Sequence, residues 1–196
     1  MIKIGITGGI ASGKTVASNF FKEKDDSFVF NADQISKRHL KKSKNLQKKI
    51  IHIFGNDIVV KKNIDFKLLA DKAFKNKTNH KILNGIMWPE IYMLINNTYN
   101  KEKNNGKKIF VVDAALIFEA NFQNFFDKII LITAKKDIRI KRAIKRNNIP
   151  LESIQNRISL QMSDSKKIKM ADYVINNNSD IDKFKNSLCK IYSQLF

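Results

Sequence analysis

One stretch near the start of the chain, Gly8 to Thr15, constrains the fold more than any other part of the sequence. It matches G-x-x-x-x-G-K-[ST], the pattern of a phosphate-binding loop. The β-branched run Ile2–Ile6 before it predicts a short buried strand, and the apolar residues between Thr15 and Phe21 have helical spacing. Because strand, loop and helix follow one another as the pattern requires, we expect a nucleoside triphosphate to bind here. The alternative, an ordinary glycine-rich turn, leaves most of the pattern unexplained.

The residue types of this loop suit a chain of phosphates. Glycines allow a tight turn and leave backbone N–H groups free to point at phosphate oxygens, and the new helix adds the positive end of its dipole. Lys14 can reach the β- and γ-phosphates, and the Thr15 hydroxyl can ligate Mg²⁺. The residues that we expect to contact ATP here are Gly8, Gly9, Ala11, Ser12, Gly13, Lys14, Thr15 and Val16.

Apolar runs alternate with helical patterns along the rest of the chain. Further strands are predicted at 28–30, 109–113, 128–133 and 172–176. Helices are predicted at 34–54, 66–99, 136–147, 151–162 and 181–195. This alternation predicts an α/β fold with a five-stranded parallel sheet flanked by helices on both faces. Ligands of such sheets bind at the carboxyl ends of the strands.

The long helical region between the second and third strands is typical of a subdomain that covers a substrate. We expect Pro89, inside it, to start or kink a helix. We therefore divide a single P-loop unit into a core (1–55, 108–137 and 166–196), a helical substrate-binding insertion (56–107) and a helical lid (138–165).

The composition predicts a globular protein without a membrane span. The chain has 196 residues, and none of its apolar runs approaches the length of a membrane span. Its first residues lack the basic and apolar segments of a signal peptide. A single cysteine, Cys189, excludes an internal disulfide framework. We expect a cytoplasmic protein, and a monomer because no long apolar stripe is left over.

The formal net charge of +19 favours anionic ligands. Only five of the 37 basic residues are arginines, and asparagine and isoleucine are abundant throughout the chain. This pattern indicates a coding bias spread over the surface, because a nucleic-acid site would favour arginine and exposed aromatic residues. We do not expect nucleic acid to be the primary partner.

Two aspartates follow predicted strands and are candidates for phosphoryl-transfer chemistry. Asp33 comes just after the second strand, where a carboxylate can orient an acceptor hydroxyl and accept its proton, but an N-cap of the next helix explains it equally well. Asp113 ends the third strand, the usual position of a carboxylate that holds Mg²⁺ or its water shell. A strand-end turn residue is the alternative.

Arg139, Arg142 and Arg146 follow the fourth strand at helical spacing, and therefore share one helix face. In small kinases such a face belongs to a lid that closes on the transferred phosphoryl group. A solvated basic surface is the alternative, although planar bidentate phosphate contacts are a reason to have arginine in a lysine-rich chain. Glu119, after the third strand, faces either the cleft or a solvated loop, and the sequence does not decide between them.

The combination of segments indicates a narrower group of proteins than the P-loop kinases in general. Residues 6–15 resemble the loop of dephospho-CoA kinases, in which T-G-G-I-x-S-G-K is typical, and Asn31-Ala32-Asp33 resembles the D-A-D of that family. Further segments resemble its F-G, L-A-x-x-x-F, H-P-x-I, D-x-P-L-L-F-E, R-I-x-x-Q and A-D-x-V-I-x-N motifs. In order, they are Phe54-Gly55, Leu69–Phe74, Trp88–Ile91, Asp113–Glu119, Arg157–Gln161 and Ala171–Asn177. The matches run in family order over nearly the whole chain.

This resemblance implies ATP-dependent phosphorylation of the ribose 3′-hydroxyl of dephospho-CoA, the last step of coenzyme A synthesis. It implies that Asp33 is the base and that Arg142 stabilises the transferred phosphoryl group. It further implies that Asn176 and Asn177 lie near the base of ATP, and that Leu116 and Glu119 join Asp33 at the substrate. On this basis the catalytic residues are Asp33, Lys14 and Arg142, and the Mg²⁺ residues are Thr15 and Asp113.

The sequence also departs from the family pattern. Ala11 replaces a usual glycine, which the loop tolerates if φ at Ala11 stays negative. Asn31 replaces the first aspartate of D-A-D, Trp88 replaces histidine and Ala115 replaces proline. Phe66 stands where the family often has an arginine. These changes affect the expected substrate contacts more than the phosphate chemistry.

Three other functions are compatible with parts of this pattern. Another nucleoside or nucleotide kinase would share the core but leave the later motifs unexplained. A basic nucleic-acid-binding ATPase would use the positive charge, and a degenerate ATP-binding protein would have lost catalysis. The retention of Gly13, Lys14, Thr15, Asp33 and Arg142 argues against the last of these.

Overall fold

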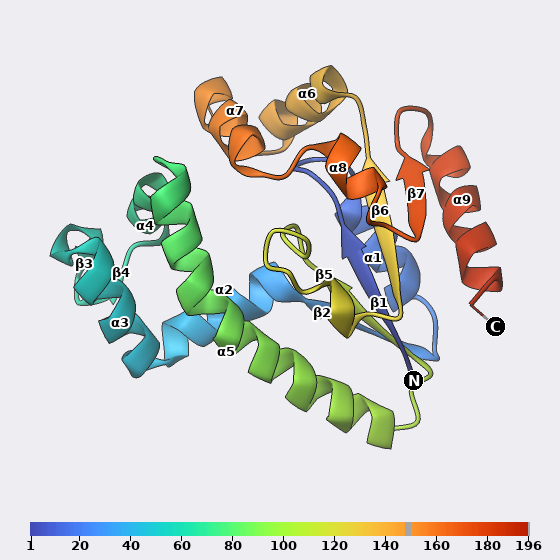
Figure 1. The fold of residues 1–196 in the computed structure, drawn as a ribbon, viewed down its shortest axis with the longest axis horizontal. Coiled ribbons are helices and arrows are strands. Elements are labelled where there is room, and N and C mark those ends of the chain that lie inside the picture. Colours follow the sequence, from blue (N-terminus) through green and yellow to red (C-terminus); the bar gives the residue numbers. More distant parts are fainter. Residues whose placement is uncertain (148–149, 196) are drawn as a thin grey trace. The chain divides into compact units, whose positions relative to one another are not determined.

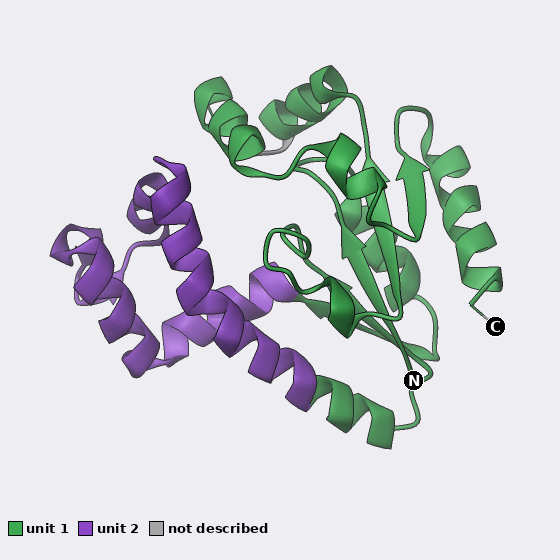
Figure 2. Cartoon of the chain, viewed as in Figure 1, with its two compact units in different colours: residues 1–31, 98–196 green, residues 32–97 purple. Residues whose placement is uncertain are grey.

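The structure, a computed structural model, describes residues 1–147 and 150–195, with only the backbone for 146 and 147. Two compact units are formed, one by Met1–Asn31 with Thr98–Phe196 and one by Ala32–Asn97 (Figure 2). Along the chain, the second unit is inserted between two strands of the first. It shares residues 56–97 with the predicted substrate-binding insertion and also takes in the helices that directly follow the second strand.

The first unit contains a parallel sheet with the strand order β2-β5-β1-β6-β7 (Figure 1). Within the described residues this sheet has five strands, which confirms the predicted α/β fold. The strands are β1 (Ile2–Thr7), β2 (Ser27–Asn31), β5 (Ile109–Asp113), β6 (Lys128–Thr133) and β7 (Tyr173–Asn176).

The register brings the carboxyl ends of the strands to one edge. Asp113 of β5 lies opposite both Ile6 of β1 and Asn31 of β2. Thr133 of β6 lies opposite Asn176 of β7. The loop after β1, the central strand, therefore opens between polar residues that come from its neighbours on both sides.

The first unit has helices where apolar spacing predicts them. One further helix, α8, is too short for its pattern to be recognised in the sequence. Among the described residues, these helices are α1 (Lys14–Lys22), α6 (Lys136–Asn147), α7 (Leu151–Leu160), α8 (Asp164–Ile168) and α9 (Ile181–Ser193), with a 3-10 turn η2 (Gln123–Phe125).

Both faces of the sheet are covered, as expected for parallel strands. On one face, β-branched residues of β1, β5 and β6 pack with Phe21 of α1 and Leu188 of α9. The fully buried members are Ile4, Ile6, Ile109, Val111, Ile130 and Ile132. On the other face, the ring of Phe110 stacks on Phe28 and meets the edge of Tyr99. Successive residues of β5 thus enter different layers, which explains why the whole strand is apolar.

The second unit has its own apolar core, built from residues such as Leu46, Ile50, Phe54 and Leu69. The single helical stretch predicted at 34–54 is two helices, because Ser43 caps the second one by accepting a hydrogen bond from the Leu46 N–H at 3.3 Å. The elements are α2 (Ala32–Lys42), α3 (Lys44–Phe54), η1 (Asn56–Ile58), β3 (Val59–Val60), β4 (Asn63–Ile64), α4 (Phe66–Ala73) and α5 (Lys77–Asn104), of which α5 continues into the first unit.

Pro89 lies inside α5, so no helix starts there. None of the helices within residues 1–147 and 150–195 combines the length and the apolar character that crossing a bilayer requires.

Candidate active site

The phosphate loop connects β1 to α1, and Gly13 forms the N-cap of the helix. The φ angle of Gly13 is 115°, and a Cβ there would lie 2.2 Å from the Asn177 side-chain nitrogen. Glycine is therefore required by the backbone and by the close approach of Asn177. The helix begins at Lys14, so its unpaired N–H groups and the positive end of its dipole lie beside the loop.

Ala11 has a φ of 56°, in the left-handed region. The condition under which the sequence tolerates alanine here, a negative φ, is therefore not met. A non-glycine residue in this region carries a penalty of about 1–2 kcal/mol. The contacts that hold neighbouring loop residues must outweigh that penalty.

A pocket of about 310 Å³ opens over the loop and the start of α1. Its lining consists of Ala11–Val16 together with Arg142, Asn177, Ser179 and Ile181. The size is within the range of small-molecule sites. Most of the lining consists of residues expected to contact ATP. Ser179 and Ile181 are not among them, and their only sequence signal is their place just after Asn177 at the end of β7.

Lys14 and Ser12 are polar groups of the loop itself. The Lys14 ammonium donates to the carbonyl oxygens of Gly8 at 2.9 Å and Gly9 at 3.4 Å, so its charge lies over the loop. The Ser12 hydroxyl is fully buried and has no hydrogen-bond partner among the residues that the structure describes. Thr15 is exposed and lines the pocket, so its hydroxyl is accessible to a ligand.

Asn177 supports the loop from the end of β7. Its side-chain nitrogen donates to the Ser12 carbonyl oxygen at 2.8 Å, and its own carbonyl oxygen accepts a hydrogen bond from Arg142 at 3.0 Å. Asn176, in contrast, accepts from the Thr133 hydroxyl at 2.6 Å and does not line the pocket. Of the two asparagines assigned to ATP, only Asn177 is therefore at the pocket.

Asp113 is buried at the end of β5, within the sheet edge that carries the loop. One of its carboxylate oxygens accepts from the Ser18 hydroxyl at 2.6 Å and from the Asn31 side chain at 3.4 Å. The asparagine that replaces the first aspartate of D-A-D is thus a donor to Asp113. An aspartate at this position would place a second carboxylate there instead.

Asp33 belongs to the second compact unit and is exposed in the first turn of α2. The helix begins at Ala32, so Asp33 is not the N-cap that the sequence offered as an alternative. Its negative charge near the N-terminus of α2 is favoured by the helix dipole. As an exposed side chain, Asp33 can be reached by a ligand.

Arg139 and Arg142 of α6 lie in different surroundings. Arg142 lines the pocket, whereas Arg139 is only 5% exposed and forms an ion pair with Asp164 at 2.8 Å. The side chain of Arg146 lies outside the described residues. Shared helical spacing therefore did not indicate which arginine reaches the pocket.

Glu119 is not in a solvated loop, one of the two environments that the sequence left open, and it does not line the pocket over the phosphate loop. Its carboxylate forms an ion pair with Lys167 at 2.8 Å and accepts from the Met162 N–H at 2.8 Å. Lys167 is fully buried, and the Glu119 side chain is 13% exposed. Leu116, in the same loop, is half-buried.

Known proteins match the chain over nearly its full length. The model of the family described as dephospho-CoA kinase matches residues 2–183. A dephospho-CoA kinase of Fusobacterium nucleatum subsp. nucleatum is 39% identical over 184 residues, which are 93% of this chain and 93% of that protein.

Solved structures share the fold. A dephospho-CoA kinase from Campylobacter jejuni superposes with a TM-score of 0.68 at 27% identity, covering 98% of this chain and 96% of the other. A protein of Thermus thermophilus superposes with a TM-score of 0.81 over 100% of this chain and 98% of its own. It is 23% identical, a level at which the likeness shows the fold alone.

Proposed function

The chain belongs to the dephospho-CoA kinase family, an ATP-dependent kinase family, and from this premise we propose which of its residues carry the reaction. The phosphoryl group passes from ATP to the ribose 3′-hydroxyl of dephospho-CoA, giving coenzyme A and ADP. The observation that best supports these assignments is the pocket over the phosphate loop, because it gathers Lys14, Thr15, Arg142 and Asn177 at the carboxyl edge of the sheet.

Lys14 and the loop amides bind the β- and γ-phosphates. The Lys14 ammonium already lies over the carbonyl oxygens of Gly8 and Gly9, so phosphate oxygens can replace these acceptors with little movement. Gly9 and Gly13 let Arg139 and Asn177 pack directly against the loop backbone. Arg142 carries the remaining positive charge of the pocket and stabilises the charge that develops on the transferred group.

The donor set at the edge of the sheet fits Mg²⁺, which prefers oxygen ligands and keeps several of its waters. The accessible Thr15 hydroxyl and the Asp113 carboxylate would hold the ion. Asp113 would do so through water molecules bound to the ion, because one Asp113 oxygen already accepts a hydrogen bond from Ser18. When bound, Mg²⁺ neutralises charge on the phosphates. Ser18 and Asn31 fix the orientation of Asp113.

Asp33 acts as the base that orients the acceptor hydroxyl and takes its proton. Its exposure in the first turn of α2 supports this assignment, since a substrate hydroxyl can reach the carboxylate from solvent. We assign the substrate-binding role to the helical insertion. We also propose that the enzyme works as a monomer in the cytoplasm, a reducing compartment in which the exposed Cys189 thiol stays unpaired.

A coupled assay of ADP release tests the substrate. With ATP and Mg²⁺, we compare dephospho-CoA with adenosine, AMP and single-stranded RNA, and identify the product by mass. We expect ADP only with dephospho-CoA, together with coenzyme A. ADP release with adenosine or AMP would support the assignment as a kinase but reject dephospho-CoA as its substrate. Release stimulated only by RNA would show that the net charge of +19 serves a nucleic acid.

A further inference from the structure

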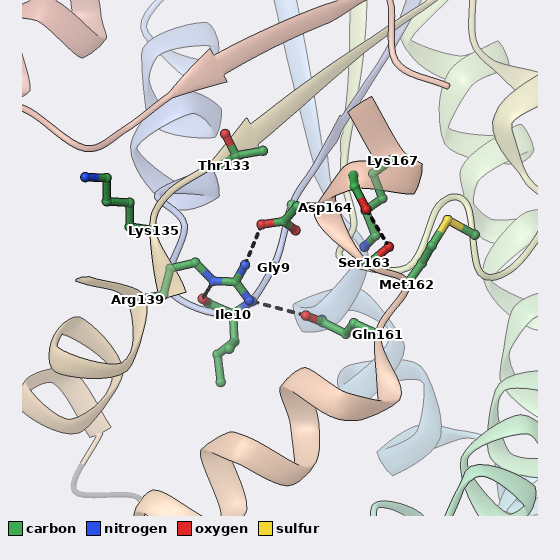
Figure 3. Close-up of polar contacts among 12 residues, drawn as sticks. Gly9, Ile10, Thr133, Lys135, Arg139, Gln161, Met162, Ser163, Asp164 and Lys167 are labelled. Carbon is green, nitrogen blue, oxygen red and sulfur yellow. Dashed lines mark hydrogen bonds and ion pairs between the residues drawn. The ribbon is translucent and has the colours of Figure 1, made fainter. Parts of the chain in front are cut away.

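Both backbone groups of Ile10, in the middle of the phosphate loop, are held by side chains from more than a hundred residues away. The Arg139 Nε donates to the Ile10 carbonyl oxygen at 3.1 Å. The Ile10 N–H donates to the Gln161 side-chain oxygen at 3.3 Å. Figure 3 shows the two side chains meeting at Ile10 from different segments. One loop residue is therefore bonded to residues at the start of α6 and just after α7.

The Arg139 side chain is itself fixed. It is 5% exposed, and its Nη1 donates to Asp164 of α8 at 2.8 Å (Figure 3). A Cβ at Gly9 would lie 2.3 Å from Nη2, so the guanidinium packs directly on the loop backbone at a place where only glycine fits. Its planar group serves the loop carbonyl and the carboxylate at the same time, which a lysine cannot do with the same geometry.

These hydrogen bonds lie on one side of Ala11, whose backbone conformation is disfavoured for a residue other than glycine, and a further bond lies on the other side. Ile10 is bonded by Arg139 and Gln161, and the Ser12 carbonyl oxygen accepts from Asn177 at 2.8 Å. Ala11 lies between them with a φ of 56°. Since both neighbouring residues are held, Ala11 cannot relax to a negative φ without breaking at least one of these bonds. Such strain persists only where the surroundings enforce it.

We propose that Arg139 and Gln161 are positioning residues for the phosphate loop. By holding both backbone groups of Ile10, they keep Ala11 in its left-handed conformation and so keep the adjacent loop amides in the arrangement that binds nucleotide phosphates. This rests on the proposed use of the loop for ATP. It also gives Arg139 a different role from Arg142, which faces the pocket. Because Arg139 and Gln161 lie near the two ends of the proposed lid, 138–165, they tie both ends of that segment to the loop.

The rescue of one substitution by another tests the proposal. Arg139→Met removes the hydrogen bond to the Ile10 carbonyl oxygen, so the backbone at Ala11 can relax. Only a fraction of the molecules then has the loop conformation that binds phosphates, and the apparent ATP affinity falls by that fraction. Glycine carries no penalty at this φ. Ala11→Gly should therefore restore most of the affinity in the Arg139→Met background. The matched control is Lys141→Met, which removes one exposed positive charge from the same helix.

Affinity for ADP and for a non-hydrolysable ATP analogue is measured by calorimetry with Mg²⁺, alongside KM, kcat and melting temperature. We expect Arg139→Met to weaken nucleotide binding on the order of tenfold, which corresponds to about 1.4 kcal/mol. The KM for dephospho-CoA should change by less than about twofold, and Lys141→Met should behave as the parent. In the Ala11→Gly background the loss from Arg139→Met should fall to about threefold or less. Gln161→Met should follow the same pattern, because it removes the other bond to Ile10.

Two results would overturn the proposal. One is a lower melting temperature with unchanged nucleotide affinity in the folded variant, which would make Arg139 a stabilising residue only. The other is an equal loss of nucleotide affinity from Arg139→Met in the parent and in the Ala11→Gly background, which would show that Arg139 does not act through the backbone strain at Ala11. Failure of the parent protein to bind ATP would instead reject the proposed function, so the two failures are distinguishable.

Discussion

Replacing Glu119 by glutamine should destabilise the protein strongly, because it leaves a charge without its partner in the interior. Lys167 is fully buried, and its ammonium lies 2.8 Å from the Glu119 carboxylate. Two unit charges at this distance attract by about 6 kcal/mol at an effective dielectric constant of about 20. After Glu119→Gln, the other contact of the ammonium is the Ala115 carbonyl oxygen at 3.4 Å.

The measured cost of breaking such a buried pair is about 3–5 kcal/mol. In a protein of this size about 1 kcal/mol shifts the melting temperature by about 2–4 °C, so we expect a decrease of about 6–20 °C. Lys167→Met should cost less than Glu119→Gln. The remaining carboxylate is 13% exposed and keeps its hydrogen bond from the Met162 N–H. The double variant Glu119→Leu/Lys167→Met should recover most of the stability, because no buried charge remains.

Thermal and urea unfolding followed by circular dichroism measure these differences. The control is Lys166→Met, which removes an exposed lysine from the same helix and should stay within about 0.5 kcal/mol of the parent. If Glu119 serves the substrate instead, Glu119→Gln will raise the KM for dephospho-CoA and leave the melting temperature unchanged. That result, or a double variant as unstable as the sum of the single ones, would refute the argument from buried charge.

Three more predictions concern single side chains. Lys14→Ala should lower turnover on the order of 10³-fold or more, since it removes a phosphate-clamping charge, and unchanged turnover in a steady-state assay would reject the loop assignment. Asp33→Asn should lower kcat by about 10²–10⁴-fold with nearly unchanged ATP affinity by calorimetry, whereas an equal loss of both would argue against a base. The hydrogen bond from Lys72 lowers the pKa of Asp57 below its ordinary 3.8, so this carboxylate contributes stability above about pH 4 that is lost as pH falls through the lowered pKa. Asp57→Asn should therefore be less stable than the parent at neutral pH, and urea unfolding should show this difference shrinking in acid; a constant difference would contradict the assignment.

Local sequence was sufficient for the sheet but not for the small elements. Buried parallel strands are continuous apolar runs, so 109–113 and 128–133 were recognisable in the sequence. The hairpin of β3 and β4 has only two residues in each strand, and its turn places Lys61 and Lys62 at positive φ, which lysine does not signal. The break between α2 and α3 depends on a single serine cap.

The residues of the candidate site likewise differ in how far the sequence indicates their positions. The loop is a contiguous pattern, so its residues could be proposed one by one from the sequence, and Ala11–Val16 line the pocket. The φ of Ala11 was not, because residues from α6 onward hold the loop. Nothing in the spacing of the α6 arginines indicates that Arg139 is buried against the loop while Arg142 reaches the pocket. The pairing of Glu119 with Lys167 is likewise a contact between distant segments.

The order of the sheet also sets the sequence of events during synthesis of the chain. Within residues 1–147 and 150–195, β1 pairs with β5 and β6 and β2 pairs with β5. Neither strand therefore has one of these partners until residue 109 and those after it have left the ribosome. Residues 32–97, in contrast, are contiguous and have their own apolar core. We expect this inserted segment to become compact first. The loop between β1 and α1 is thus among the first parts to be made and among the last to take its final form.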